Sequence, residues 1–507
     1  MRVRLLFLGL SILLFTLACG QGRELPGAGG TSDSWQTFAH GDFSVRLPAW
    51  PQAASDDNAV IHSIGDGTAT LWIKPWPLPP RLVGENLQEW AQKNEEVNLV
   101  QDSISPGRAT FELTIADSLY MRTLLVYCAA QSFEITLAAP RSRFEDYRPL
   151  LAEVEPACDT SWRPPRLARG APGMVIVPAS GENSAFDPAA YQQALYLARQ
   201  NGVLVSHYYT QWGEIEKAPG QYDWRVLDYI VEAHQLEDLQ LSLVVNVIHT
   251  SVRGRVPPDL ENATFADERF KQRLAAFAAA LARRYAGRLH YLAIGNEVNN
   301  YFARHRDEVE TYAQAFQQAR AAVHVVNPDL PVGIVFAYHD AETGGTLDIV
   351  QRLNRGDYIA FTLYLFDEGY HFTRDPALFD GYVENMLNTA GPTPLAIVET
   401  GWSTAPELDG SEAAQAQYVH EIFETLRKRG RDILFLSWFA MHDSTPQTCQ
   451  NQALSFFEPG QSPDPAQLRA FVSFLCYFGL RRADGTPKPA WHTWADEAER
   501  YYAEQER

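Results

Sequence analysis

The sequence has few cysteines and few positive charges for its length. Its 507 residues include 5 cysteines, and 42 Lys and Arg stand against 62 Asp and Glu, which leaves a net charge of −20. This acidic balance argues against nucleic acid and against an anionic membrane surface as partners, because both would repel the protein. The sequence contains no Cys-x-x-Cys pair and no Cys/His cluster. Neither a zinc site nor a redox motif is therefore indicated.

Long hydrophobic runs are also missing, with one short exception at the N-terminus. Arg2 and Arg4 precede the apolar run 5–17, which is shorter than the roughly 20 residues that a membrane helix needs. This pattern favours a cleaved export signal over a permanent anchor helix. The letters TLAC that end at Cys19 resemble a bacterial lipoprotein signal, with an ordinary secretory signal as the alternative. The resemblance implies lipidation of Cys19, membrane contact only through that anchor, and a place outside the cell membrane.

Four cysteines remain in the mature chain, an even number that suits disulfide bonds in an oxidising compartment. They are Cys128, Cys158, Cys449 and Cys476. Three pairings are possible. Pairing by proximity, Cys128 with Cys158 and Cys449 with Cys476, keeps each bridge inside one predicted domain, and we favour it.

The composition, 46% hydrophobic and 21% charged, is that of a globular chain with a large core. After a signal peptide at 1–19, residues 20–34 are rich in Gly and small polar residues and predict a flexible tether. Residues 35–160 alternate short strands with two helical stretches, which predicts a small α+β domain of unknown role. In element order this domain loosely resembles the photosystem PsbP-like fold, which implies no chemistry. Residues 161–172 have the Pro, Arg and Gly content of a linker to a domain at 173–507.

Strands and helices alternate throughout that second domain. Near-continuous apolar runs, typical of buried parallel strands, occupy 173–179, 202–212, 239–248, 289–298, 331–339, 358–366, 394–402 and 433–441, and helical spacing occupies 188–200, 224–234, 267–285, 308–326 and 412–429. Eight such repeats predict an α/β fold, the (β/α)8 TIM barrel. An open doubly wound sheet is the alternative, but no GxGxxG motif follows the first strand.

Two of the predicted strands end in a glutamate. Glu297 follows the fourth strand in YLAIGNEVN, and Glu399 ends the seventh in PLAIVETGW. Barrel chemistry lies at the carboxyl ends of the strands, where the fourth and seventh lie roughly opposite each other. Two such carboxyl groups are what double-displacement glycoside hydrolysis needs, one as general acid and base and one as nucleophile. A salt-bridged structural role is the alternative, but a buried charge is costly without a partner.

Aromatic and amide side chains follow other strands at the same mouth. These candidate substrate-binding residues are Tyr208 and Trp212 after the second strand, Asn246 and His249 after the third, Asn296 after the fourth, Tyr364 after the sixth, Trp402 after the seventh and Trp438 after the eighth. Asn296 could bond the hydroxyl beside the anomeric carbon, Tyr364 could orient the nucleophile, and Trp438 could form an apolar floor. Core packing is the alternative for Tyr208, Trp212, Trp402 and His249.

Together these strand ends resemble the clan A glycoside hydrolases over about residues 173–502. The Asn-Glu pair after the fourth strand, the Glu after the seventh, the Tyr after the sixth and the Trp after the eighth carry the resemblance. It implies that Glu297 is the acid/base and Glu399 the nucleophile, with a carbohydrate substrate and no metal or organic cofactor. Many clan members also have an Arg at the end of the second strand, and residues 202–212 contain none. The family within the clan, the sugar and the oligomeric state stay open.

Several other functions are alternatives to this interpretation. A transglycosylase could use the same glutamate pair, and a lipid-anchored sugar-binding protein could keep the barrel without activity. A metal-dependent hydrolase would want a His-x-His after the first strand, where 178–183 has no histidine. A lysine Schiff-base aldolase is disfavoured because the eight strands contain no lysine. A retaining β-glycoside hydrolase acting on an extracellular oligo- or polysaccharide is the function that the sequence favours.

Overall fold

The computed structural model describes residues 35–40, 43–50, 52–53, 61–64, 69–76, 78–116, 118–152, 154, 156–158, 164–179, 186–457 and 463–505. The predicted signal peptide, its Cys19 and the tether at 20–34 lie outside these residues. No helix within them has the length and apolar character that crossing a bilayer requires. The chain divides into two compact units, a first built from Met1–Trp76, Gly84–Cys128 and Phe133–Cys158 and a second built from the remaining residues.

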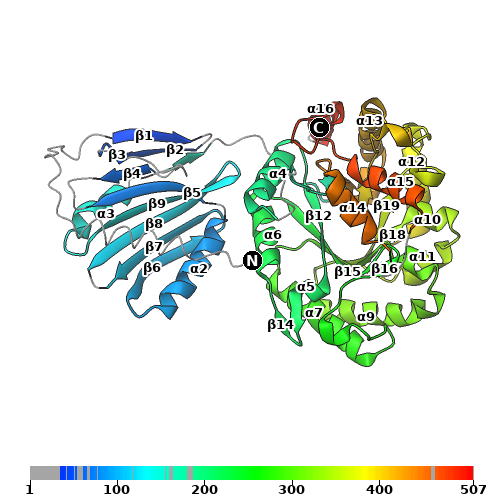
Figure 1. The fold of residues 1–507 in the computed structure, drawn as a ribbon, viewed down its shortest axis with the longest axis horizontal. Helices are drawn as coiled ribbons and strands as arrows, with labels where there is room; N and C mark the ends of the chain where they lie inside the picture. The colour runs from blue at the N-terminus through cyan, green and yellow to red at the C-terminus, as the bar shows by residue number, and fades with distance from the viewer. Residues whose placement is uncertain are drawn as a thin grey trace. The chain divides into compact units, whose positions relative to one another are not determined.

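The first unit is made of antiparallel strand pairs and two helices (Figure 1). Its larger sheet has the order β3 (Gln52–Ala53), β4 (Ile61–Ile64), β5 (Thr70–Trp76), β9 (Gln131–Pro140), β8 (Leu119–Cys128), β7 (Arg108–Ile115), β6 (Val97–Ser105). The smaller sheet joins β1 (Trp35–His40), β2 (Phe43–Pro48) and β10 (Pro156–Cys158), and the helices are α2 (Pro80–Lys93) and α3 (Phe144–Ala152). A disulfide between Cys128 and Cys158 links the two sheets. The predicted small α+β domain is confirmed as a fold class.

The second unit is a closed barrel of eight parallel strands (Figure 1). In order around the barrel these are β11 (Ala171–Met174), β12 (Val205–Thr210), β15 (Gln240–His249), β17 (Tyr291–Asn296), β18 (Val332–Ala337), β19 (Tyr358–Leu363), β20 (Leu395–Thr400) and β21 (Ile433–Trp438). The ring closes because β11 pairs with both β12 and β21. The predicted TIM barrel is therefore confirmed, although its first strand lies at Ala171–Met174 rather than at 173–179.

Helices follow the strands around the barrel. The longer ones are α4 (Pro188–Gln200), α6 (Arg225–Leu236), α7 (Glu268–Arg284), α9 (Val309–Val326), α11 (Leu347–Leu353), α12 (Phe379–Ala390), α13 (Glu412–Arg429) and α16 (Pro489–Gln505). Two begin where the sequence has a cap: the Asp187 carboxylate accepts from the amides of Ala189 and Ala190, and Ser411 accepts from the amide of Ala414. These caps explain why α4 and α13 have the predicted bounds.

Short elements occupy the connections. They are α5 (Trp212–Ile215), α8 (Val298–Phe302) and α10 (Tyr338–Thr343), the strands β13 (Glu216–Ala218), β14 (Gln221–Tyr222) and β16 (Val252–Arg253), and the 3-10 turns η1 (Pro258–Leu260), η2 (Arg306–Glu308), η3 (Glu368–Tyr370), η4 (Pro376–Leu378), η5 (Pro406–Leu408) and η6 (Gly430–Asp432). Two further helices, α14 (Pro446–Leu454) and α15 (Pro465–Cys476), lie in the chain between β21 and α16 and are called here the α14–α15 pair.

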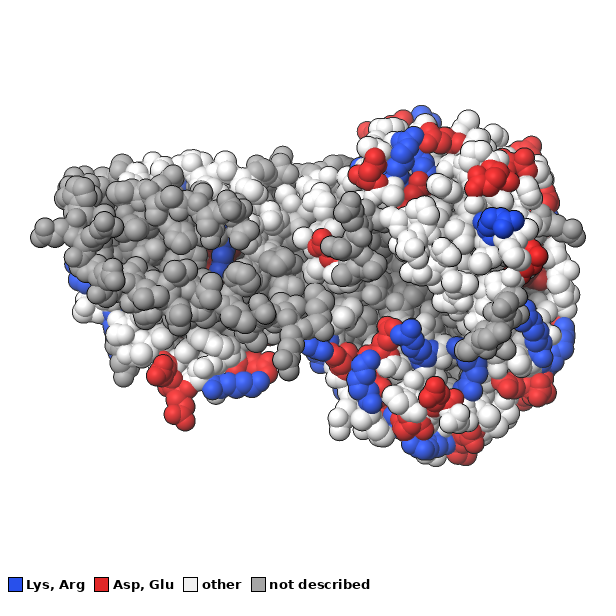
Figure 2. Space-filling view, in the orientation of Figure 1, with Lys and Arg blue, Asp and Glu red and all other residues white. Residues whose placement is uncertain are grey.

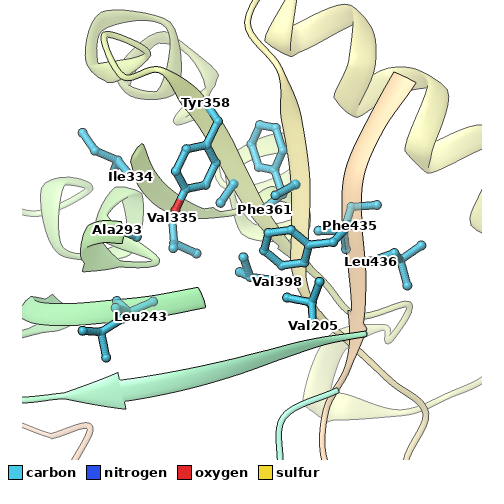
Figure 3. Close-up of a cluster of buried hydrophobic side chains, with 14 of the residues drawn as sticks. Val205, Leu243, Ala293, Ile334, Val335, Tyr358, Phe361, Val398, Phe435 and Leu436 are labelled. Carbon is cyan, nitrogen blue, oxygen red and sulfur yellow. The ribbon is translucent and has the colours of Figure 1, made fainter. Parts of the chain in front are cut away.

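Branched and aromatic side chains from all around the ring pack in one core, on the inner and outer faces of the barrel sheet. Val205, Leu243, Phe361, Val398 and Phe435 are among the strand residues that Figure 3 draws, and all five are buried. Burying one such side chain stabilises the fold by about 1.5 to 3 kcal/mol. Where Figure 2 shows the outer surface of the barrel unit, acidic and basic side chains are interspersed.

Candidate active site

Glu297 follows the last residue of β17 and precedes α8. Its backbone has φ +49° and ψ +40°, in the left-handed region, which costs a residue with a side chain about 1 to 2 kcal/mol. Strain of this kind is typical of functional sites. The carboxylate accepts two hydrogen bonds of 2.6 Å, from Thr250 Oγ1 to Oε2 and from Thr362 Oγ1 to Oε1. Two hydroxyl groups, one just after β15 and one in β19, therefore hold this side chain in place.

Glu399 lies in β20 and is 7% exposed. The Tyr209 hydroxyl donates to its Oε1, and the Tyr364 hydroxyl donates to its Oε2 at 2.6 Å. Tyr209 lies in β12, the second barrel strand, where the clan resemblance would expect an Arg. Among the described residues, no ion pair involves Glu297 or Glu399. Glu399 is thus held by two neutral phenols.

The two carboxyl groups differ in their protonation. Burial, and after it the charge of nearby Glu399, raise the pKa of Glu297 to about 8, against the opposing effect of the hydrogen bonds from Thr250 and Thr362. Burial also raises the pKa of Glu399, but hydrogen bonds from Tyr209, Tyr364 and Asn296 stabilise its ionised form. Near neutral pH the pair therefore holds its proton on Glu297 and its charge on Glu399. One carboxylic acid beside one carboxylate is the arrangement that acid and nucleophile roles need.

Four of the predicted substrate-binding residues lie at or near this pair. Asn296 is adjacent to Glu297 and bonds Glu399, while Tyr364 holds the same carboxylate. The His249 ring lies 6.5 Å from the Tyr209 ring. Asn246 lies in β15 and is 3% exposed. The strand ends thus bring these side chains to one mouth.

Tyr208 and Trp212 lie elsewhere. Successive side chains of a strand point to opposite faces, so Tyr208 faces away from the interior side that Tyr209 occupies, and its ring lies 6.4 Å from that of Tyr191 in α4. Trp212 is fully buried, and its indole N–H donates to Glu216 Oε2 at 2.7 Å. Both side chains are part of the packing rather than of the site, which corrects the expectation from sequence.

The tryptophans after β20 and at the end of β21 are also packed away. Trp438 is fully buried, with its indole N–H donating to the Phe478 carbonyl at 3.0 Å. Its neighbour Phe439 has its ring 6.3 Å from the ring of Tyr364, so Phe439 takes the place predicted for Trp438. Trp402 is 1% exposed, and its ring lies 5.0 Å from that of Phe372. Core packing is the role of both tryptophans.

Sequence reasoning missed four residues of the site, namely Tyr209, Thr250, Thr362 and Phe439. No signal in the sequence sets Tyr209 apart from Tyr208, because a strand that is buried on both faces lacks polar alternation. Thr250 and Thr362 have no signal of their own in the sequence, because each is an ordinary residue until the fold brings it to Glu297. Thr250 and Thr362 lie 47 and 65 residues away from Glu297 in the chain.

Several buried polar atoms near the strand ends lack a hydrogen-bond partner within the described residues. They are Asn246 Oδ1, Asn296 Oδ1, His207 Nε2, His249 Nδ1 and His339 Nδ1. Burial lowers the pKa of His207 to about 3 and that of His249 to about 4, so both rings are neutral at pH 7. A buried polar atom without a partner is costly.

In the described part of the chain, one group of side chains lies close enough together to hold a metal ion, and it lies on α13 and α16. His420, Glu424 and Glu497 could each offer one ligand atom there. Arg427 already pairs with Glu497 at 2.6 Å and with Glu424 at 2.7 Å. The carboxylates of this group are therefore neutralised by a guanidinium, and the group is separate from the glutamate pair.

The chain resembles known proteins in fold but not in sequence. No protein-family model matches the chain, and no curated protein matches its sequence. Among solved structures, a GH5_18 variant from Bifidobacterium longum subsp. longum, in complex with Manβ1-4GlcNAc, aligns with a TM-score of 0.51 at 14% identity, covering 65% of this chain and 78% of that chain. At this identity the likeness shows the fold of the barrel alone.

Two further solved structures align with lower scores. GH5_18 from Streptomyces cattleya, in complex with GlcNAc, has a TM-score of 0.49 at 16% identity, covering 68% of this chain and 81% of that chain. An exo-β-1,4-mannosidase from Opitutaceae bacterium strain TAV5 has a TM-score of 0.48 at 19% identity, covering 66% of this chain and 60% of that chain.

Proposed function

We propose that the barrel is a retaining β-glycoside hydrolase of the clan A type. One observation carries the proposal: two buried carboxyl groups share one barrel mouth, where burial and the charge of Glu399 favour the protonated form of Glu297, while hydrogen bonds stabilise the ionised form of Glu399. A pair of carboxyl groups with separated pKa values is what double displacement requires.

The reaction assigns one step to each glutamate. Glu399 attacks the anomeric carbon, while Glu297 donates its proton to the departing glycosidic oxygen, so that the leaving group departs as an alcohol. The resulting glycosyl ester on Glu399 is then attacked by water, from which Glu297, now ionised, removes a proton. The second step frees Glu399 and restores the protonated Glu297. Two inversions at one carbon give retained configuration.

The neighbours of the pair support these steps without exchanging atoms with the substrate. Tyr209 and Tyr364 direct both oxygens of Glu399, which fixes the attacking lone pair. Thr250 and Thr362 hold the Glu297 carboxyl group. A nucleophile without a cationic partner keeps more of its basicity than one that is paired with a guanidinium, because no positive charge stabilises its ionised form.

The place of action is part of the same proposal. The N-terminal apolar run and Cys19 support export and lipid anchoring outside the cell membrane, where an oligo- or polysaccharide would be the substrate. The acidic net charge agrees with a neutral substrate rather than a polyanion.

The purified protein should be incubated with a panel of aryl β-glycosides and of plant and bacterial polysaccharides, with product anomers followed by NMR. We expect release of sugar with retained configuration, lost in Glu399→Gln and kept in Glu499→Gln, a change of an exposed carboxylate on α16. Inverted product, or full activity in Glu399→Gln, would contradict the proposal. Binding without release would favour a sugar-binding protein, and transfer to an added sugar in place of water would favour a transglycosylase.

A further inference from the structure

Six rings form a continuous series at one side of the barrel mouth, called here the aromatic arc. They are His249, Phe456, Phe471, Tyr370, Phe366 and His339. Consecutive ring centroids lie 4.7, 5.4, 5.2, 5.4 and 4.9 Å apart in that order. Each ring therefore contacts the next along the series.

The aromatic arc spans the sector of the mouth that holds Glu297. Its two ends come from the barrel itself, with His249 as the last residue of β15 and His339 in α10, directly after β18. β17, which Glu297 follows, lies between β15 and β18 in the ring. Thr250, next to His249 in the chain, donates to Glu297 at 2.6 Å. The Glu297 side of the glutamate pair therefore faces this part of the mouth.

Tyr370 gives a second indication of the same proximity. Burial, and after it the negative charges of Asp340 and Glu297, raise its pKa to about 12. The middle of the aromatic arc is thus within electrostatic range of the proposed acid. In a glycosidase the acid protonates the leaving oxygen, so the leaving group has to lie beside it.

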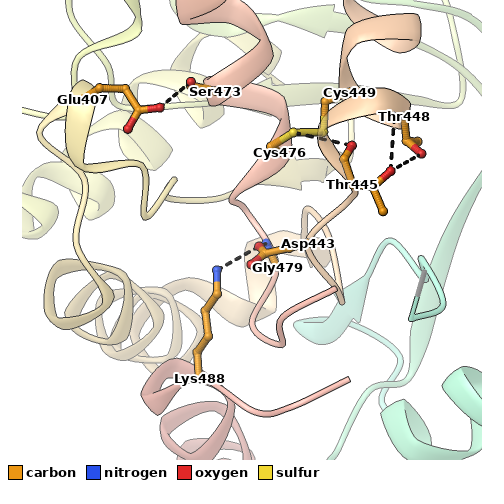
Figure 4. Close-up of a disulfide and its surroundings, with 9 residues drawn as sticks. All are labelled: Glu407, Asp443, Thr445, Thr448, Cys449, Ser473, Cys476, Gly479 and Lys488. Carbon is orange, nitrogen blue, oxygen red and sulfur yellow. Dashed lines mark hydrogen bonds and ion pairs between the residues drawn. A yellow bond between two sulfur atoms is a disulfide. The ribbon is translucent and has the colours of Figure 1, made fainter. Parts of the chain in front are cut away.

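The α14–α15 pair supplies Phe456 and Phe471 and is fastened to the barrel at several points. A disulfide joins Cys449 in α14 to Cys476 in α15 (Figure 4). Ser473 Oγ donates to Glu407 Oε1 at 2.5 Å, which ties α15 to the loop after β20. Ser251 Oγ donates to the Phe456 carbonyl at 2.8 Å, which ties the end of α14 to the β15–β16 turn.

A buried ion pair fixes the base of the same segment. Lys488 Nζ lies 2.8 Å from Asp443 Oδ1, and the amide of Gly479 donates to the same oxygen at 2.8 Å (Figure 4). Both charged side chains are almost fully buried. The rings that the α14–α15 pair contributes are therefore held in position before any ligand arrives, which reduces the entropy lost on binding.

The rings keep surface for a ligand. Phe456, Phe471, Tyr370 and Phe366 are half-buried rather than buried, although each contacts its neighbours. At the ends of the series, the Nδ1 atoms of His249 and His339 are buried and have no hydrogen-bond partner in the described part of the chain. Burial lowers the pKa of both imidazoles, which keeps them neutral. The exposed parts of the four half-buried rings offer apolar faces to a sugar ring, which has apolar C–H faces of its own.

We propose that the aromatic arc binds the sugar ring on the leaving-group side of the scissile bond. This inference rests on the proposed function, because it takes Glu297 as the acid. It names the substrate class: a β-linked oligosaccharide whose leaving group is itself a sugar ring, in preference to a simple alkyl glycoside. The stacking rings hold that sugar.

The first test compares two substrates with the same glycon. A β-linked disaccharide places a leaving-group sugar on the aromatic arc, whereas the matching glycosyl fluoride has no leaving-group ring. We expect Tyr370→Ala and Phe471→Ala to lower the ratio of kcat/KM for the disaccharide to that for the fluoride by about tenfold each. Tyr370→Phe, which keeps the ring, should keep the ratio. Tyr477→Ala removes an exposed aromatic of the same segment outside the arc and is the control.

An unchanged ratio in both alanine variants, with the fold intact by circular dichroism, would overturn the inference.

A second measurement needs no turnover: Glu399→Gln protein is titrated calorimetrically with β-linked disaccharides of glucose, mannose, galactose and N-acetylglucosamine. We expect one of these to bind, with affinity lowered about tenfold when Tyr370→Ala is added. Equal affinity with and without that change, or no binding by any disaccharide, would also overturn it. Wild-type protein that binds but never cleaves would refute the proposed function and leave the aromatic arc supported.

Discussion

Thr362 and Tyr364, two positions apart at the end of β19, donate hydrogen bonds to the two different glutamates. Thr362 Oγ1 bonds Glu297 and the Tyr364 hydroxyl bonds Glu399, each at 2.6 Å. Residues two apart on a strand share a face, so one strand end reaches both carboxyl groups. The positions of the proposed acid and nucleophile are thereby tied to a single rigid element.

Thr362→Val should move the alkaline limb of the pH–rate profile to higher pH. The Thr362 hydrogen bond stabilises ionised Glu297, so its loss favours the protonated form and raises the pKa further. The limb lies near pH 8 in the native protein, and a shift of about half a unit is expected from one lost hydrogen bond. Measuring kcat/KM from pH 5 to 10 checks this, and an alkaline limb that stays in place or moves downward would contradict it.

Tyr209→Phe should impair the nucleophile. Removing a hydrogen bond to a buried ionised group costs about 1.5 to 3 kcal/mol, which corresponds to a loss of roughly tenfold to hundredfold in kcat/KM. The acid limb of the profile should also rise, because ionised Glu399 has lost one of its donors. Tyr208→Phe is the matched control, since the adjacent hydroxyl faces away from the site. Equal effects of the two substitutions would refute the assignment of Tyr209.

Glu297→Ala should slow substrates according to their leaving group. Aryl glycosides whose leaving groups are acidic phenols need little protonation, whereas natural sugars need the acid in the transition state. We expect the loss in kcat/KM to grow steeply as the pKa of the leaving group rises. A plot of log kcat/KM against leaving-group pKa, compared with that of the native protein, gives the answer, and parallel plots would speak against an acid role.

Glu297→Gln should stabilise the barrel at neutral and alkaline pH but not in acid. The carboxyl group has a pKa of about 8 in the folded protein against 4.5 as a free side chain. Between these values the folded state holds a proton that the unfolded state has lost, so stability falls as pH rises through this window and then levels off. Glutamine does not titrate and avoids this loss.

Thermal unfolding at pH 4 and at pH 8 tests that difference. The variant should gain about 2 to 4 °C in Tm relative to native protein at pH 8, and little at pH 4. Glu499→Gln, with an exposed carboxylate, serves as the control. A gain of the same size at both pH values would point to a packing effect instead of proton linkage.

Much of the barrel could be predicted from the sequence because its signals are local. Near-continuous apolar runs identify strands that are buried on both faces, and Asp187–Pro188 and Ser411 mark where α4 and α13 begin. A polar pair directly after a buried strand marked Asn296 and Glu297. These features need only neighbouring residues, so the fold class and the two glutamates followed from the sequence.

The direction in which individual side chains point could not be predicted from the sequence. Tyr208 and Tyr209, like Trp438 and Phe439, are adjacent aromatic residues on strands buried on both faces, so their sequence has no polar alternation to say which one points inward. The register of the closed barrel decides which aromatic residue points inward. In this barrel the inward residues are Tyr209 and Phe439. The sequence alone determined the strands, the helix starts and the strand-end glutamates, because these depend on local pattern. Only the tertiary structure decided the partners of those glutamates and the aromatic arc, because they depend on contacts between residues far apart in the chain.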